Sequence, residues 1–194
     1  EISNLKTGIK NTLIGSIKSK IPDVGFGITT FDDEDYADKG HRVTQYITTS
    51  ETTIKNSVNN VNDGDGVDEV HTDAIYYSAT GEAHGTVPAV NCSGKEGSIG
   101  GACFRSGALP IFIMMTDEVI QSNVKNSTQA VSAMNGIKAK FIGIDSSSSG
   151  VVKSGYNTIS QGTGSIDGSG IQFYYNISTT GTGLSDNIAT GVAY

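Results

Sequence analysis

The sequence predicts an α/β fold of the doubly wound class, in which helices cover both faces of a mostly parallel central sheet. Segments with strand character alternate with segments of helical periodicity along the chain. Residues 109–115 (LPIFIMM) form a uniformly apolar run, which is typical of a strand buried on both faces. A length of 194 residues suits one domain with a hydrophobic core, so we expect a single domain over residues 1–194.

The first predicted helix has apolar residues at spacings of three and four, which places them on one face. These residues are Ile2, Leu5, Ile9, Leu13, Ile14, Ile17 and Ile21. Pro22 ends the helix because proline cannot continue the hydrogen-bond ladder. Residues 24–31 (VGFGITTF) and 43–49 (VTQYITT) have the β-branched content of strands, and we expect them to pair as a hairpin.

Two helices are expected in the middle of the chain. Ser50 can cap the first of them. The second carries Val70, Ala74, Ile75 and Ala79 on one face, and Gly81 ends it. A polar, glycine-rich segment then leads to the apolar strand at 109–115. The alternation continues with a helix at 127–137, a strand at 139–144, a helix at 151–159, a strand at 171–177 and a final helix from residue 184.

The composition and the motifs argue against several classes of function. The formal net charge is -7 and the basic residues are scattered, so we do not expect nucleic acid as a partner. No apolar run is long enough for a membrane span, and no signal peptide is visible. Nucleophile-elbow, Walker and zinc-ligand spacings are also missing from the sequence, so we expect no enzyme. His41, His71 and His84 are expected to be surface or loop residues.

Cys92 and Cys103 flank a glycine-rich stretch that can bend back on itself. Such a pair suits one disulfide that closes a loop, and a disulfide would indicate an oxidising compartment. Two free thiols in a cytosolic protein are the alternative.

Asp117 directly follows the apolar strand at 109–115. Ligands of open α/β sheets bind beyond the carboxyl ends of the strands, so Asp117 is a candidate binding residue. A helix cap or turn former is the alternative for this carboxylate. Acidic residues also gather at 32–35 and 63–69, where they could hold a hard cation or form solvated loops.

Four segments resemble a known family, in the order that the family has them. They are IPDVGFGITTFDDEDY, DGDGVDEVHTDAIYYSATG, CFRSGALPIFIMMTDE and GTGSIDGSGIQFYYNISTTGTGLSDNIATGV. They resemble von Willebrand factor A domains of bacterial surface proteins, and the second is also similar to the integrin β-subunit I-like version. The resemblance implies a Rossmann-like fold and a secreted or cell-surface adhesion module.

The resemblance also implies a metal-ion-dependent adhesion site with Mg²⁺ or Mn²⁺. Asp117 matches the family's aspartate after the fourth strand, and Glu69 matches the integrin-type carboxylate of the middle loop. One coordination position stays open for an acidic residue of a protein partner. Glu1, Asp63 and Asp65 are candidates for an auxiliary Ca²⁺ site, with helix-cap or loop roles as the alternative.

The chain departs from the family at its start. The family's first central strand and its Asp-x-Ser-x-Ser motif are missing, so we expect an upstream segment or a neighbouring subunit to supply a strand. One alternative function is therefore a structural subunit of a surface filament or pilus-like assembly without metal dependence. Another is an intracellular A domain of the chelatase or AAA-associated type, which should lack a disulfide.

Overall fold

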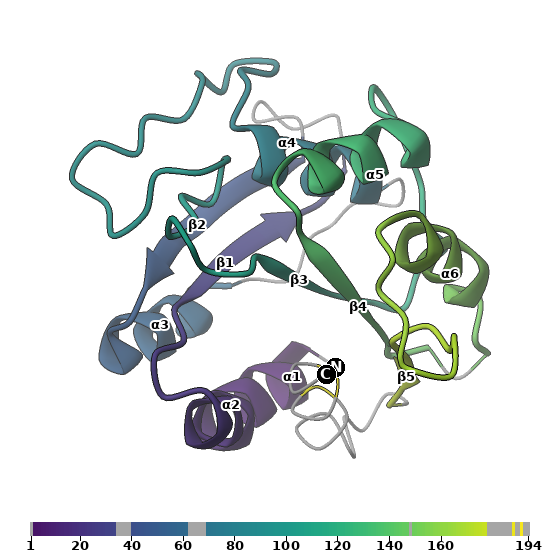
Figure 1. Ribbon diagram of the computed structural model, residues 1–194, viewed down its shortest axis with the longest axis horizontal. Coiled ribbons are helices and arrows are strands. Elements are labelled where there is room, and N and C mark those ends of the chain that lie inside the picture. Colours follow the sequence, from purple (N-terminus) through teal and green to yellow (C-terminus); the bar gives the residue numbers. More distant parts are fainter. Residues whose placement is uncertain are drawn as a thin grey trace. The chain divides into compact units, whose positions relative to one another are not determined.

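A computed structural model describes residues 2–33, 40–61, 69–147 and 149–177, together with Ile188 and Gly191. The chain divides into two compact units. The parallel-sheet unit comprises Glu1–Val24, Ile111–Val119 and Lys140–Tyr194. The hairpin unit comprises Gly25–Pro110 and Ile120–Ala139. Each unit is mixed α/β, and Figure 1 labels their helices and strands.

The parallel-sheet unit contains three parallel strands in the order β3, β4, β5. They span Ile111–Thr116 (β3), Lys140–Asp145 (β4) and Tyr174–Asn176 (β5). β3 and β4 pair without interruption from Ile111 opposite Lys140 to Thr116 opposite Asp145. Helix α6 (Lys153–Gly162) packs against β4 and β5 (Figure 1). This unit confirms the predicted parallel pairing of strands that alternate with helices.

Tyr156 of α6 connects the helix to two strands. Its side chain is fully buried, and its hydroxyl donates towards the carbonyl oxygens of Met114 at 3.0 Å and Ile144 at 3.3 Å. The ring lies directly over Gly143, where an added Cβ would come within 2.4 Å of a ring carbon. Only glycine fits at this position of β4, because any side chain would overlap the ring.

The first predicted helix is confirmed, with one irregularity. It runs as α1 (Ile2–Gly8), a π-helical turn η1 (Ile9–Leu13) and α2 (Ile14–Lys20). The N–H of Ile14 donates to the carbonyl oxygen of Ile9, which closes the wider π turn. Leu13, Ile14 and Ile17 are buried, as the apolar periodicity predicted.

The hairpin unit is built on the antiparallel pair β1 (Phe26–Phe31) and β2 (His41–Thr48), which confirms the predicted hairpin (Figure 1). Its helices are α3 (Glu51–Asn59), α4 (His71–Thr80) and α5 (Ser127–Gly136). Ser50 caps α3 by accepting the N–H of Thr53 at 3.3 Å. Gly81 ends α4 with a φ of 72°, a left-handed conformation that favours glycine.

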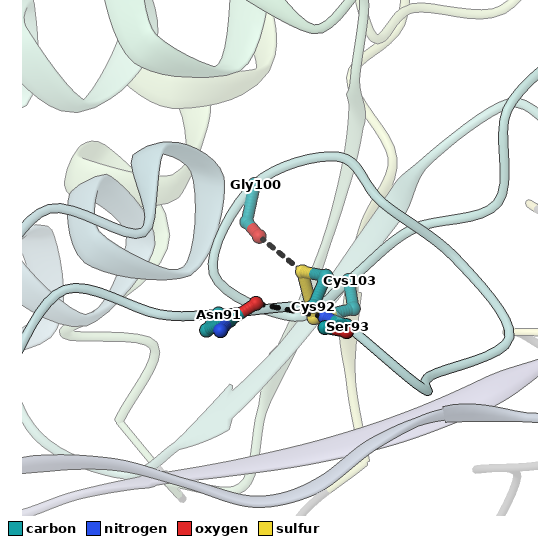
Figure 2. The surroundings of a disulfide bond; sticks show 5 residues. All are labelled: Asn91, Cys92, Ser93, Gly100 and Cys103. Atoms are coloured by element: carbon teal, nitrogen blue, oxygen red, sulfur yellow. Dashed lines mark hydrogen bonds between the residues drawn. A yellow bond between two sulfur atoms is a disulfide. The ribbon is translucent and has the colours of Figure 1, made fainter.

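The long loop between α4 and β3 contains the predicted disulfide. The Cys92 and Cys103 sulfurs are bonded at 2.06 Å (Figure 2). The same loop is held to regular structure by backbone hydrogen bonds: Ile47 of β2 donates to Ala102 at 3.0 Å, and Gly101 donates to Ser78 of α4 at 2.9 Å. The loop is therefore an ordered part of the hairpin unit.

The last predicted strand is shorter than expected. Residues 171–177 were expected to be extended, but β5 covers only Tyr174–Asn176. The carboxylate of Asp167 accepts the N–H groups of Ser169 and Ile171, and Ile166 pairs with Gln172 in an isolated bridge. The start of the predicted strand therefore belongs to a tight turn. Of the predicted final helix, the structure describes Ile188 and Gly191, and both are helical.

No helix among the described residues has the length and apolar character required to cross a membrane.

Candidate functional site

Asp117 lies immediately beyond the carboxyl end of β3. The backbone before it is fixed, because the N–H of Ser146 donates to the carbonyl oxygen of Thr116 at 3.1 Å. The N–H of Glu118 donates to the Thr116 hydroxyl, also at 3.1 Å. The Asp117 side chain itself is exposed and makes no hydrogen bond or ion pair with another described residue. Asp117 does not cap a helix, since Asn126 caps the next helix, α5, but it lies in a bend, so the turn-former alternative stands.

A second aspartate ends the neighbouring strand. Asp145 is fully buried, and its carboxylate accepts the Tyr174 hydroxyl at 2.5 Å and the N–H of Ser147 at 2.8 Å. Burial, together with the hydrogen bond to Asp145, raises the pKa of Tyr174 to about 12. Tyr174 is therefore a protonated donor at neutral pH. The sequence analysis missed Asp145, although its place at the end of a predicted parallel strand is equivalent to that of Asp117.

Glu69 lies in the hairpin unit, just before α4. Its backbone is held against the residues that directly follow β1, because Glu69 forms an isolated antiparallel bridge with Asp33 and the N–H of Val70 donates to the carbonyl oxygen of Asp32 at 3.2 Å. The Glu69 side chain is 25% exposed, and its Oε2 lies 3.2 Å from Nε2 of His71. This carboxylate is thus held by a neighbour and remains accessible to solvent.

The prediction that the histidines are surface or loop residues is wrong for His71 and His41. Their exposed fractions are 0% and 4%, because α4 and β2 turn these side chains towards the interior. His41 places Nε2 3.1 Å from the Ser78 hydroxyl. His84 is half-buried, and its ring stacks on Tyr77 with the ring centroids 4.0 Å apart.

The first turn of α4 also holds the loop of residues 121–125. The Thr72 hydroxyl donates to the carbonyl oxygen of Gln121 at 3.2 Å and contacts that of Lys125. Asp73 is 3% exposed. Its carboxylate accepts three successive backbone N–H groups, from Asn123, Val124 and Lys125, at 3.0 to 3.2 Å. Asp73 therefore has a structural role, since both carboxylate oxygens are occupied by the loop.

The donors for the expected cation are carboxylate oxygens, which suit Mg²⁺ or Mn²⁺. Asp117 belongs to the parallel-sheet unit and Glu69 to the hairpin unit, and each is described within its own unit. Glu1, Asp63 and Asp65, the candidates for an auxiliary Ca²⁺ site, lie outside the described residues. Within the described ranges, no three side chains of His, Cys, Asp and Glu form a group that could hold a metal ion. A cation at Asp117 or at Glu69 would therefore need further oxygen ligands, such as hydroxyl groups, carbonyl groups or water.

Comparison of the chain with protein-family models and with curated proteins gives no match.

Proposed function

We propose that this protein is a von Willebrand factor A-like binding module that acts outside the cell. In this proposal Asp117 is a ligand of a divalent cation, Mg²⁺ or Mn²⁺, and an acidic residue of a protein partner completes its coordination. The observation that carries the proposal is the exposed Asp117 carboxylate directly beyond the carboxyl end of a parallel strand. Ligands of open α/β sheets bind at that edge.

The chemistry required is binding rather than catalysis. A hard cation with an octahedral oxygen shell can be held by a few protein oxygens and still accept one carboxylate from a partner. The Cys92–Cys103 disulfide supports a location outside the cell, because disulfides persist in oxidising compartments. A count of free thiols in protein isolated without reductant tests this location, and two free thiols would favour the intracellular alternative.

Titration with Mn²⁺ tests the cation site. Asp117→Asn keeps the size of the side chain and removes the ligand charge, so we expect the affinity for Mn²⁺ to fall at least about tenfold. Glu118→Gln is the matched control, because it removes the same charge from the adjacent exposed side chain. The control should bind Mn²⁺ as the unchanged protein does. Equal Mn²⁺ affinity of the Asp117→Asn variant and the unchanged protein, measured by calorimetry, would refute the proposal.

A second candidate function is favoured by β3. Among the described residues β3 pairs with β4 alone, and Ile111, Phe112, Ile113 and Met115 are only half-buried. An apolar edge strand is a template for strand addition. In this alternative a neighbouring subunit adds a strand, and the protein is a subunit of a surface assembly.

Light scattering separates the two candidates. Assembly by strand addition between copies should increase the molar mass with protein concentration, equally in EDTA and in Mn²⁺. A monomeric mass at every concentration in both solutions would contradict assembly between copies and leave the adhesion proposal in place.

A further inference from the structure

The hairpin unit contains a polar hollow that has no part in the proposed cation site. Its volume is about 150 Å³, and the polar residues that line it are Thr30, Asp32, Arg42, Thr44 and Asn60. All five belong to the hairpin unit. We propose that this hollow is a binding site for one neutral monosaccharide unit. The proposal goes beyond the cation-dependent function and does not depend on it.

The lining comes from one face of the hairpin. Thr30 of β1 lies directly opposite Arg42 of β2 in the antiparallel register, so the two side chains share a face. Thr44 follows Arg42 by two positions and therefore points to the same side. Arg42 and Thr44 are exposed, whereas His41, on the opposite face, is buried. The hollow therefore lies on the solvent-facing side of the hairpin, where a ligand can reach it.

Two polar side chains of the lining are available to a ligand. Neither the Thr30 hydroxyl nor the Asn60 side-chain amide makes a hydrogen bond with another described residue. Asn60 ends α3 through its backbone, whose N–H donates to the carbonyl oxygen of Ser57 at 3.0 Å. A hydroxyl and an amide each offer both donors and acceptors. Sugar hydroxyl groups also donate and accept, so the two sides match.

The charges of the lining favour a neutral ligand. The Asp32 carboxylate and the Arg42 guanidinium have opposite charges, so an anion would meet the carboxylate and a cation would meet the guanidinium. Like charges brought together at a binding site oppose binding. An apolar ligand would remove water from these groups without replacing its hydrogen bonds. A neutral ligand with many hydroxyl groups avoids both costs.

The volume sets the size of the ligand. A cavity of about 150 Å³ is large enough for a single six-membered ring. The hollow therefore suits one pyranose ring, either as a free monosaccharide or as one unit of a longer chain.

NMR of the unchanged full chain in EDTA tests the proposal without the proposed cation. The probes are glucose, galactose, mannose, N-acetylglucosamine and N-acetylgalactosamine. At least one of them should shift the backbone amide signals of Thr30, Arg42 and Asn60. We expect a dissociation constant of roughly 1–10 mM, because so small a ligand makes few contacts. No shift of these signals by any of the five sugars at about 100 mM would overturn the proposal.

Two variants test whether the bound sugar lies in the hollow. Thr30→Val keeps the branched shape of the side chain and removes the hydroxyl. Asn60→Ala removes the amide at a backbone φ of -87°, which alanine adopts readily. Each variant should bind the sugar about 3–10-fold more weakly, because one hydrogen bond is lost. Thr52→Val, at an exposed threonine of α3 outside the lining, is the matched control and should bind normally. Unchanged affinity of both Thr30→Val and Asn60→Ala would overturn the proposal.

Inorganic phosphate tests the charge argument in the same experiment. The Asp32 carboxylate should keep phosphate out of the hollow, so the three amide signals should not move. If phosphate shifts them and none of the sugars does, the hollow is an anion site and the proposal is overturned.

Discussion

At the residue scale, buried polar side chains in both units are held by specific donors. Asp73 accepts hydrogen bonds from three backbone N–H groups. Asp145 accepts hydrogen bonds from the Tyr174 hydroxyl and from the backbone N–H of Ser147, and His71 accepts one from the N–H of Gln121. Hydrogen bonds of this kind offset the desolvation of buried polar groups. Asp117 is exposed and makes no such bonds among the described residues, which distinguishes a candidate ligand from a structural carboxylate.

Glu96 should make folding stability depend on pH. The Thr48 hydroxyl, which donates at 2.5 Å, and the N–H of Thr49 lower the pKa of Glu96 below its ordinary value of 4.5. The pKa is lower in the folded than in the unfolded state, so the ionised carboxylate stabilises the protein above the unfolded value. This stabilisation is lost as the pH falls through the folded pKa.

Urea unfolding of the unchanged protein and of Glu96→Gln, from about pH 7 to about pH 3, checks this prediction. The difference in unfolding free energy should be largest near neutral pH and shrink in acid. Thr48→Val, which removes the strongest donor, should reduce the difference at neutral pH. The same difference at both ends of the pH range would contradict the prediction.

At the scale of elements, close packing between a helix and a strand decides which positions tolerate a side chain. α6 meets β4 through the Tyr156 ring, which leaves no space for a Cβ on Gly143. Gly15 lies in α2 with nothing within 4 Å of its added Cβ. Packing therefore requires a glycine at position 143 but not at position 15.

Gly143→Ala should destabilise the protein by about 1–3 kcal/mol, because the new methyl group forces the ring or the strand to move. Gly15→Ala should stabilise it by up to about 1 kcal/mol, because alanine has the higher helix propensity. Urea midpoints of both variants measure the effects. A neutral Gly143→Ala variant would show that the interface between α6 and β4 adjusts freely.

The disulfide should also contribute at this scale. It joins cysteines separated by 11 positions, and closing such a loop restricts the unfolded chain. Replacement of both cysteines by alanine should lower the unfolding free energy by about 2–4 kcal/mol. Reductant should destabilise the unchanged protein and have no effect on the double variant. Thermal unfolding with and without reductant measures both effects, and no response of the unchanged protein would contradict the prediction.

At the scale of the whole molecule, a cation that binds only the folded protein should stabilise it against unfolding. A ligand that binds only the folded state adds about 2.7 kcal/mol at a hundred times its dissociation constant. Saturating Mg²⁺ or Mn²⁺ should therefore raise the thermal midpoint of the unchanged protein. Asp117→Asn should lose this shift and Glu118→Gln should retain it. An equal shift in the Asp117→Asn variant would place the cation elsewhere.

Local sequence patterns were sufficient to predict most elements. The apolar periodicity of the first helix, the cap at Ser50, the stop at Gly81 and the disulfide are all confirmed. Helical periodicity, caps and strand propensity depend on residues close in the chain, so the sequence contains them directly. The position of Asp117 beyond a parallel strand follows from the same local information.

The contacts of the buried site residues could not be predicted from local patterns. His71 contacts Gln121 fifty positions away, and Asp145 contacts Tyr174 twenty-nine positions away. The burial of His71 and the acceptor role of Asp145 depend on which distant segments pack together. A local pattern contains no information on such contacts, and a histidine near the start of a predicted helix looks the same whether it faces solvent or the interior. Only the tertiary structure therefore identified His71 as a buried acceptor for the N–H of Gln121.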